Sequence, residues 1–328
     1  MKESDIRSRE ALEIYLKLVQ EDCEKYFSDK ASFARVPCSA CQGVGIHARF
    51  TKNGFEYGVC KDCGTLYVRN RPSAEALLKF YAESRSTSYW VNCFFMPFID
   101  ARREKIFKPR VEAVAKMFGQ DPSWVIGDVG AGFGIFLEEL RGVWPKSRFV
   151  AIEPSQEQAQ ICRAKGLAVE CCFMEDLEGY KEEFDFLTAF ELFEHLLDPS
   201  EFITSIRNIL KPGGYLYLTT LNGEGFDIQV LWEKAKSVSP PHHLNFFNPG
   251  SLKQFLEKNG FEIVLLETPG QLDWDIVEGM VVKENIEAGR FWDLLAKKAS
   301  GAVKKEFQDW LSRSLLSSHM KVIARKIS

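Results

Sequence analysis

The chain has 328 residues, 45% of them hydrophobic, which suffices for one large domain and a small satellite. Its formal net charge of −4 argues against general affinity for nucleic acid, and its nine cysteines, an odd number, fit a reducing compartment better than a disulfide framework. The N-terminus is charged, and no apolar run approaches the length of a membrane span. We therefore expect a cytoplasmic protein without membrane insertion.

Two Cys-x-x-Cys pairs, separated by 18 residues, follow a predicted N-terminal helix within residues 1–37. This spacing is typical of zinc, because each pair can bind one side of a tetrahedral ion, and four thiolates leave no position for a reactive water. The alternatives are a redox-active disulfide pair and rubredoxin-like iron. Strands at 54–59 and 65–68 would form a small zinc ribbon over 38–71, which needs the metal to fold. The predicted ligands of this structural zinc are Cys38, Cys41, Cys60 and Cys63.

Residues 72–120 are predicted to be a helical linker or lid. Helices are expected at 72–80 and 101–118, joined by an aromatic stretch at 89–95. Aromatic residues at this density favour a packed core, and the alternative is a lid over the domain that follows. The basic cluster within 102–110 is expected to be a solvated helix face or, alternatively, a site that attracts a phosphorylated substrate.

A glycine-rich loop opens the last part of the chain, 121–328. It lies between a predicted strand at 123–126 and a helical pattern from Ile135, and its residues are Asp128-Val129-Gly130-Ala131-Gly132-Phe133-Gly134. Glycines let a ligand approach the backbone, and the free N–H groups of a helix N-terminus favour a carboxylate or phosphate. The loop is predicted to bind a nucleotide-type ligand, with a simple tight turn as the alternative. Ile135 replaces the last glycine of the dinucleotide fingerprint, so the pattern differs from that one.

Strands and helices alternate after this loop. Strands are predicted at 148–153, 168–171, 184–190 and 215–220, with a helix at 199–210 before a Lys-Pro-Gly-Gly turn. This alternation predicts a parallel sheet that is covered by helices on both faces.

The D-x-G-x-G-x-G loop and the Leu-Lys-Pro-Gly-Gly turn resemble those of class I S-adenosylmethionine-dependent methyltransferases, over about residues 121–270. The resemblance implies an α/β fold with a Rossmann-like, seven-stranded, doubly wound sheet, beside the N-terminal zinc ribbon. Residues 261–266 and 320–326 would be the antiparallel pair that completes the sheet, and a helical insertion at about 275–315 would precede the last strand. The implied cofactor is S-adenosylmethionine, with its amino-acid end at the glycine loop.

Glu153 ends the second strand about 20 residues beyond the glycines, where a doubly wound fold places an acid against ribose hydroxyls. A solvated charge at a strand end is the alternative. The resemblance places the adenine contacts near Phe173 and Met174. Many relatives carry Asp where this chain has Phe173, so here backbone N–H groups and stacking are expected to hold adenine. The predicted cofactor-binding residues are Asp128, Gly130, Gly132, Gly134, Glu153, Phe173, Met174 and Phe190.

Chemistry is expected directly after the fourth strand, at the edge of the sheet where ligands bind. There Glu191, Glu194 and His195 have the i, i+3, i+4 spacing of one helical face. His243 follows the fifth strand and is expected at the same end. Either His195 or His243 is a general base, or all four bind a catalytic divalent cation, or the segment only caps a helix. The E-x-x-E-H pattern is similar to that of quinone-biosynthesis O-methyltransferases and of enzymes that methylate the terminal ribose of small RNAs.

These features predict an S-adenosylmethionine-dependent methyltransferase that acts on a hydroxyl of a small molecule or of a glycan or sugar intermediate. The order of ribbon, aromatic segment and sheet is similar to that of bacterial methyltransferases that tailor sugars and glycans. C-methylation of a nucleotide-linked sugar and O-methylation of a phenolic or quinone precursor are the alternative reactions. A further alternative is a catalytically silent, cofactor-binding protein that docks a partner through its ribbon.

Overall fold

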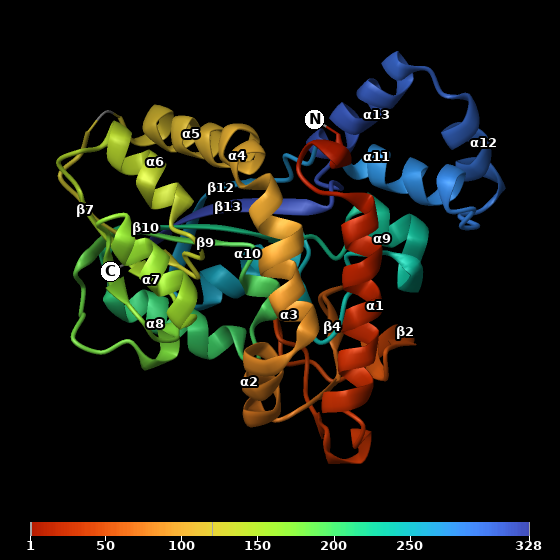
Figure 1. Ribbon diagram of the computed structural model, residues 1–328, viewed down its shortest axis with the longest axis horizontal. Helices are drawn as coiled ribbons and strands as arrows, with labels where there is room; N and C mark the ends of the chain where they lie inside the picture. The colour runs from red at the N-terminus through yellow and green to blue at the C-terminus, as the bar shows by residue number, and fades with distance from the viewer. Residues whose placement is uncertain (1, 120, 328) are drawn as a thin grey trace. The chain divides into compact units, whose positions relative to one another are not determined.

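The computed structural model describes residues 2–119 and 121–327 (Figure 1). Contacts between residues divide the chain into two compact units. The ribbon unit comprises Met1–Ile99, Leu221–Leu252 and Glu267–Met320, and the sheet unit comprises Asp100–Thr220, Lys253–Leu266 and Lys321–Ser328. Among the described residues, none of the helices combines the length and the apolar character that a membrane span requires.

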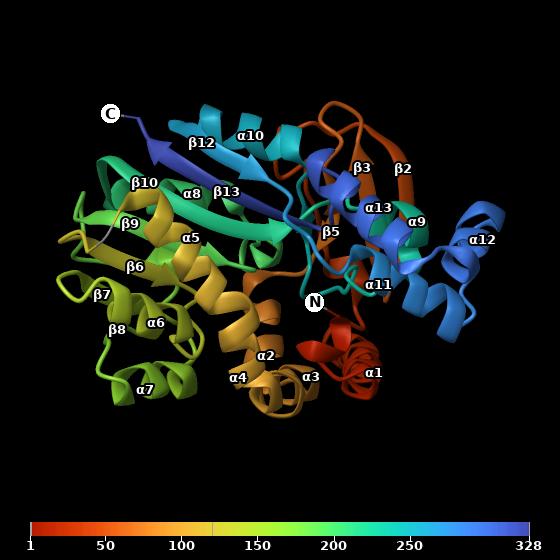
Figure 2. The ribbon, with the colours of Figure 1, turned by 90° about the horizontal axis from the view of Figure 1, so that it is seen from above.

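The sheet unit is built on seven strands in the order β12-β13-β10-β9-β6-β7-β8, which confirms the predicted fold class. The pairs β10–β9, β9–β6, β6–β7 and β7–β8 are parallel, and in Figure 2 the arrow of β13 runs opposite to those of β10 and β12. The strands are β6 (Val125–Val129), β7 (Arg148–Ile152), β8 (Ala168–Glu170), β9 (Phe184–Phe190), β10 (Leu210–Leu221), β12 (Phe261–Glu267) and β13 (His319–Lys326).

Helices of the sheet unit pack on these strands through their apolar stripes. One cluster of buried side chains joins Val114 of α5, Phe136 of α6 and Cys162 of α7 to Ile126 and Phe186 of the strands. A second group of rings joins α8 and α10 around a buried phenylalanine that follows β9. The helices are α4 (Ile99–Arg102), α5 (Lys108–Phe118), α6 (Ile135–Val143), α7 (Gln156–Ala164), α8 (Pro199–Ile209) and α10 (Pro249–Lys258).

The ribbon unit contains a four-stranded antiparallel sheet in the order β11-β4-β3-β2. Its strands are β2 (Ile46–Lys52), β3 (Phe55–Cys60), β4 (Leu66–Val68) and β11 (Asn245–Phe246). The sequence pattern predicted β3 and β4 but neither β2 nor β11. The two-residue strands β1 (Ala34–Arg35) and β5 (Asn70–Arg71) form a separate pair. A strand from far along the chain therefore completes the ribbon.

Helices make up the rest of the ribbon unit. The predicted aromatic stretch is itself helical, and within it Phe94 is buried, stacks on Trp90 at 4.2 Å and contacts Tyr15 of α1. The insertion near residues 275–315 is helical as predicted, and its Phe307 and Trp274 pack around Phe226 of α9. The helices are α1 (Arg9–Tyr26), α2 (Ala74–Glu83), α3 (Arg85–Tyr89), α9 (Phe226–Leu231), α11 (Asp273–Glu278), α12 (Arg290–Lys298) and α13 (Gly301–Arg313).

Candidate cofactor and acceptor site

The glycine loop has the conformation that its three glycines permit. Gly130, Gly132 and Gly134 have φ angles of 68°, 56° and 66°, a region that residues with a Cβ rarely adopt. At Gly134, which precedes α6, a Cβ would lie 2.8 Å from Leu167 and 2.9 Å from the Sγ atom of Cys162. At Gly132 the nearest atom to a Cβ would be 3.7 Å away. Gly134 thus allows helix packing, whereas Gly132 leaves open space on the side where a Cβ would stand.

Glu153 follows β7 and binds this loop through its carboxylate. One oxygen of its carboxylate accepts a hydrogen bond from the Gly132 N–H at 2.7 Å, and the other accepts one from the Ser155 N–H at 2.9 Å. The side chain is buried, and burial raises the pKa of its carboxyl. Carboxylate oxygens have further lone pairs, so Glu153 is also able to accept a hydrogen bond from a ribose hydroxyl.

Asp128 lies on β6, directly before the glycines, and is buried. The Thr188 hydroxyl donates a hydrogen bond of 2.6 Å to its carboxyl, and burial raises the pKa of Asp128 to about 7. Phe190, at the end of β9, contacts Phe136 edge-on at 4.8 Å. Phe173 and Met174 follow β8, the first 44% exposed and the second buried.

The segment after β9 differs from the predicted helix. Glu191 has a φ of 49°, and only Phe193–His195 form a short 3-10 turn, so Glu191, Glu194 and His195 do not share one face of an α-helix. The reason is that the Glu191 N–H donates to the carbonyl of Thr219 on β10 at 2.9 Å. The i, i+3, i+4 argument from the sequence was therefore wrong, although the segment stays at the end of β9.

Both glutamates of this segment are tied to the last residues of β10. The Thr219 hydroxyl donates to Glu191 at 2.7 Å, and the Thr220 hydroxyl donates to Glu194 at 2.9 Å. Glu194 is only 2% exposed. Burial, followed by repulsion from Glu191, raises the pKa of Glu194 to about 8. An uncharged carboxyl is thus favoured there at neutral pH unless a cation approaches.

Arg110 is a site residue that the sequence analysis missed. Its Nη2 atom lies 3.0 Å from an oxygen of Glu191, and its guanidinium carbon lies 4.6 Å from the ring centre of Phe190. The sequence predicted that the basic cluster is a solvated helix face or, alternatively, a site that attracts a phosphorylated substrate. A signal was available, because Arg110 stands four residues before Val114, which faces the core. Arg110 places a positive charge beside the two glutamates.

His243 lies in the ribbon unit, within the segment Ser239–Asn248, which we call the histidine segment. Its Nδ1 atom is 2.5 Å from the carbonyl oxygen of Ser237. A carbonyl only accepts, so Nδ1 carries the proton and the Nε2 atom of the neutral ring keeps a lone pair. His242 contacts Tyr15, Phe80 and Tyr81 instead, and burial lowers its pKa to about 3. This histidine is part of the core.

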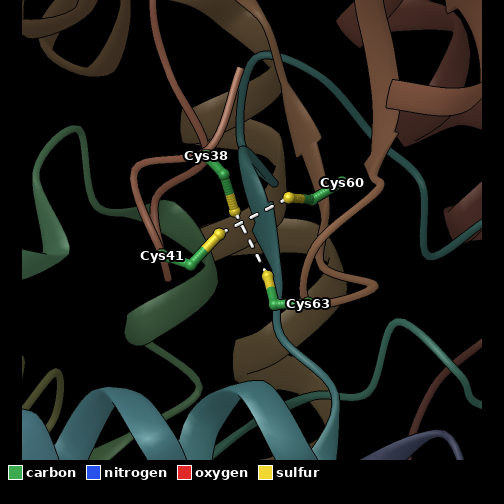
Figure 3. Close-up of side chains that lie close together, drawn as sticks. All are labelled: Cys38, Cys41, Cys60 and Cys63. Atoms are coloured by element: carbon green, nitrogen blue, oxygen red, sulfur yellow. Dashed lines mark hydrogen bonds between the residues drawn. The ribbon is translucent and has the colours of Figure 1, made fainter. Parts of the chain in front are cut away.

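The four cysteines of the ribbon converge on one point (Figure 3). The Sγ atoms of Cys38 and Cys63 are 3.6 Å apart, and those of Cys41 and Cys60 are 3.5 Å apart. Around a zinc ion with Zn–S bonds of about 2.3 Å, tetrahedral thiolates would lie about 3.8 Å from one another. The Gly43 N–H lies 3.4 Å from the Cys41 sulfur and donates to it. The arrangement fits a closed four-thiolate metal site.

Residues 99–266 match a family described as a methyltransferase domain. The chain belongs to this methyltransferase family. With its seven-stranded Rossmann-like sheet and its glycine loop, it is a class I S-adenosylmethionine-dependent methyltransferase.

Known relatives of this methyltransferase include O-methyltransferases. An uncharacterised protein of Methanocaldococcus jannaschii is 25% identical over 60% of this chain and 91% of its own length. The mitochondrial ubiquinone biosynthesis O-methyltransferase of Homo sapiens is 29% identical over 42% of this chain and 41% of its own length. The ubiquinone biosynthesis O-methyltransferase of Xanthomonas oryzae pv. oryzae is 30% identical over 44% of this chain and 64% of its own length. The chain thus spans less than two thirds of either O-methyltransferase.

Among solved structures, a chain of the complex between the Haloferax volcanii Trm112 methyltransferase activator and a methyltransferase resembles this methyltransferase. The TM-score is 0.51 at 17% identity, over 70% of this chain and 92% of that chain. At this identity the likeness concerns the fold.

Proposed function

We propose that this methyltransferase transfers the methyl group of S-adenosylmethionine to a hydroxyl oxygen of a small molecule or of a sugar or glycan intermediate. The observation that carries the proposal is the closeness of the glutamate segment to the glycine loop. A Cβ at Gly130 would lie 3.2 Å from Leu192, which stands between Glu191 and Glu194. A hydroxyl held by these glutamates would therefore lie near a cofactor bound at the loop.

Glu153, Asp128 and the glycine loop would hold the cofactor, with Phe173 and Met174 on its adenine side and Phe190 as a further contact. S-adenosylmethionine supplies a methyl group on a positively charged sulfur, an electrophile that needs no activation by the protein. The acceptor oxygen forms a bond to the methyl carbon as the carbon–sulfur bond breaks, and the hydroxyl proton must leave. The residues of the chain therefore orient the acceptor, exclude water and accept this proton.

We propose that His195 or His243 accepts the proton. Support comes from the tautomer of His243, whose Nε2 lone pair is suited to a general base. The alternative is a divalent cation held by Glu191, Glu194, His195 and His243, because carboxylates and imidazoles are common ligands of such ions. In the families that the E-x-x-E-H pattern resembles, a histidine further along the chain joins the metal site, and His243 stands in the corresponding place. A cation would lower the pKa of the acceptor hydroxyl, so that solvent water could accept the proton and no protein base would be needed.

The proposal is tested by offering sugar nucleotides, glycans and phenols with labelled S-adenosylmethionine. Transfer to a hydroxyl, located by mass spectrometry and NMR, is the expected result. Label on carbon would favour C-methylation of a sugar instead. Binding of S-adenosylhomocysteine without transfer to any acceptor would favour a silent protein whose ribbon docks a partner, and the activator in the Haloferax complex gives a first partner class to try.

A further inference from the structure

The histidine segment is built into the ribbon. Its strand β11 pairs with β4, so that Asn245 lies opposite Tyr67 and Phe246 opposite Leu66. The Val68 N–H donates to the carbonyl of Leu244 at 2.8 Å. The Tyr57 hydroxyl donates to the carbonyl of His243 at 2.8 Å. Hydrogen bonds from the backbone of β4 and from a side chain of β3 therefore hold the residues directly before β11.

Arg71 links this segment to the first cysteine knuckle. The side chain is 3% exposed, and its Nη2 atom donates to Asn245 Oδ1 at 2.6 Å and to the Ser39 hydroxyl at 2.8 Å. Ser39 lies between two of the predicted metal ligands, and its hydroxyl donates to the same oxygen of Asn245 at 2.6 Å. Buried polar groups require their partners, so these three side chains hold one another in place.

The second cysteine knuckle is bonded to the other end of the segment. The Asn248 side chain donates from Nδ2 to the carbonyl of Cys63 at 2.9 Å. Residues at the start of the segment have different supports, since His242 is enclosed by aromatic rings and the His243 N–H donates to the carbonyl of Ser239. Both knuckles thus contact the part of the segment that follows His243.

We propose that the four-cysteine ribbon is the scaffold of the histidine segment, with Arg71 as the positioning residue between metal site and His243. The inference rests on the proposed function only in assigning His243 a role in methyl transfer. Each knuckle keeps its shape because its cysteines share one ion. Without the ion, Ser39 and the carbonyl of Cys63 lose their fixed positions, and residues 243–248 lose their polar partners.

Hydrogen exchange followed by mass spectrometry on the full chain tests the proposal. Zinc removal with a chelator and Arg71→Met are each expected to raise exchange in residues 243–248 at least tenfold, with no change in the glycine loop. Ser39→Ala should retain zinc and give a smaller rise, which keeps the test informative if Arg71→Met does not fold. Arg35→Met is the matched control, because Arg35 belongs to the same unit but is exposed and pairs with Glu56.

Unchanged exchange in residues 243–248 after confirmed loss of zinc would overturn the inference. The scaffold role of the ribbon and the proposed catalytic role of His243 can be tested independently. If zinc removal raises exchange there but His243→Ala keeps full turnover, the scaffold stands and the proposed role of His243 fails. If His243→Ala abolishes turnover while zinc removal leaves exchange unaltered, the catalytic role stands and the scaffold fails. A positioning role for Arg71 further predicts a lower kcat with unchanged affinity for S-adenosylhomocysteine.

Discussion

The glycine loop and the histidine segment obtain their conformations in different ways. The loop is held by the φ angles of its glycines and by Glu153, which accepts a hydrogen bond from the N–H of Gly132, 21 positions away. The histidine segment is held by Tyr57 and Ser39, which are 186 and 206 positions away from their partners. A local motif therefore fixes one region, and distant contacts with the four-cysteine ribbon fix the other. The two regions are expected to fail under different changes.

Loss of the metal is expected to have the largest effect on stability. This effect should be confined to the ribbon and the histidine segment and should spare the glycine loop. The parent protein is expected to carry one zinc ion per chain, and Cys60→Ser should remove nearly all of it, because three thiolates bind far more weakly. Structural zinc contributes on the order of 10 kcal/mol in small modules, so the ribbon unit should unfold at a lower temperature. Elemental analysis and thermal unfolding measure both effects.

Affinity for S-adenosylhomocysteine should stay within about twofold in Cys60→Ser, since the glycine loop owes its shape to its own residues. Cys93→Ser is the control, because Cys93 is exposed and lies outside the cluster. A full zinc content in Cys60→Ser, or iron in the parent protein, would refute the zinc assignment.

Substitutions of the proposed catalytic residues are expected to have the next largest effect, and they compare a histidine in the segment after β9 with one in the histidine segment. His195→Ala or His243→Ala should lower turnover by about 10²–10⁴-fold without loss of cofactor affinity if that residue is the general base. Chelators that spare the ribbon zinc should then have no effect.

If the four residues share a cation, chelation should abolish turnover, and magnesium or manganese should restore it. Glu191→Ala and Glu194→Ala should then be as damaging as the histidine variants. Full activity in all of these variants would leave a structural cap as the role of the segment, with the proton accepted elsewhere, for instance by Tyr89.

The same comparison explains which parts of the site were predictable. The glycine loop could be identified because its ligand-facing backbone is encoded by residue types at fixed spacing, and its strands are apolar runs that end in turns. By contrast, Asn245 and Phe246 become a strand only through pairing with β4. No local pattern marks two such residues, so β11 and the ribbon contacts of the histidine segment required the structure.

Long-range contacts also explain the incorrect expectation at Glu191. Helical spacing favoured a helix there, but the N–H of Glu191 bonds instead to Thr219, 28 positions away. Arg110 was missed for a similar reason, because its pairing with Glu191 depends on how α5 lies against the sheet. Sequence thus predicted the strands of the seven-stranded sheet and the cysteine cluster, while the shorter ribbon strands and the side-chain partners across strands depended on tertiary structure.

Changes in the glycine loop should have a smaller effect, confined to the cofactor side. Gly132→Val places a branched side chain at a φ of 56°, in the space that the glycine leaves free, so affinity for S-adenosylhomocysteine should fall at least about tenfold. Glu153→Ala should weaken binding by roughly 1–3 kcal/mol, because it removes the acceptor of the Gly132 N–H as well as a ribose contact. Calorimetric titration measures both.

Gly166→Ala is the matched control for Gly132→Val, because Gly166 has a φ of 73° and lies outside the loop. It should lose stability through backbone strain but keep cofactor affinity. Zinc content should be normal in all three variants. Unaltered affinity in both Gly132→Val and Glu153→Ala, or tight binding of NAD by the parent protein, would contradict the assignment of the cofactor site.

The last expected effect is a pH dependence of stability that has opposite signs at Glu194, in the segment after β9, and at His242, in the histidine segment. Glu194 has a folded pKa of about 8 against an ordinary value of 4.5, so the folded state keeps a proton that the unfolded state releases. Its stability contribution is present below pH 4.5 and is lost as pH rises through 8. His242 has a folded pKa of about 3 against 6.5, so its contribution is present above 6.5 and is lost as pH falls toward 3.

Thermal unfolding between pH 5.5 and 9, without added divalent cation or cofactor, separates the two groups. The unfolding temperature of Glu194→Gln should exceed that of the parent by a larger amount at pH 9 than at pH 5.5. His242→Phe keeps a ring among Phe80 and Tyr81 and lacks the group that loses stability at acid pH. Relative to the parent, it should therefore gain on the order of 1 kcal/mol of stability between pH 9 and pH 5.5. Parallel pH profiles for all three proteins would mean that neither group changes its protonation on folding, which would remove the electrostatic contrast between the two regions.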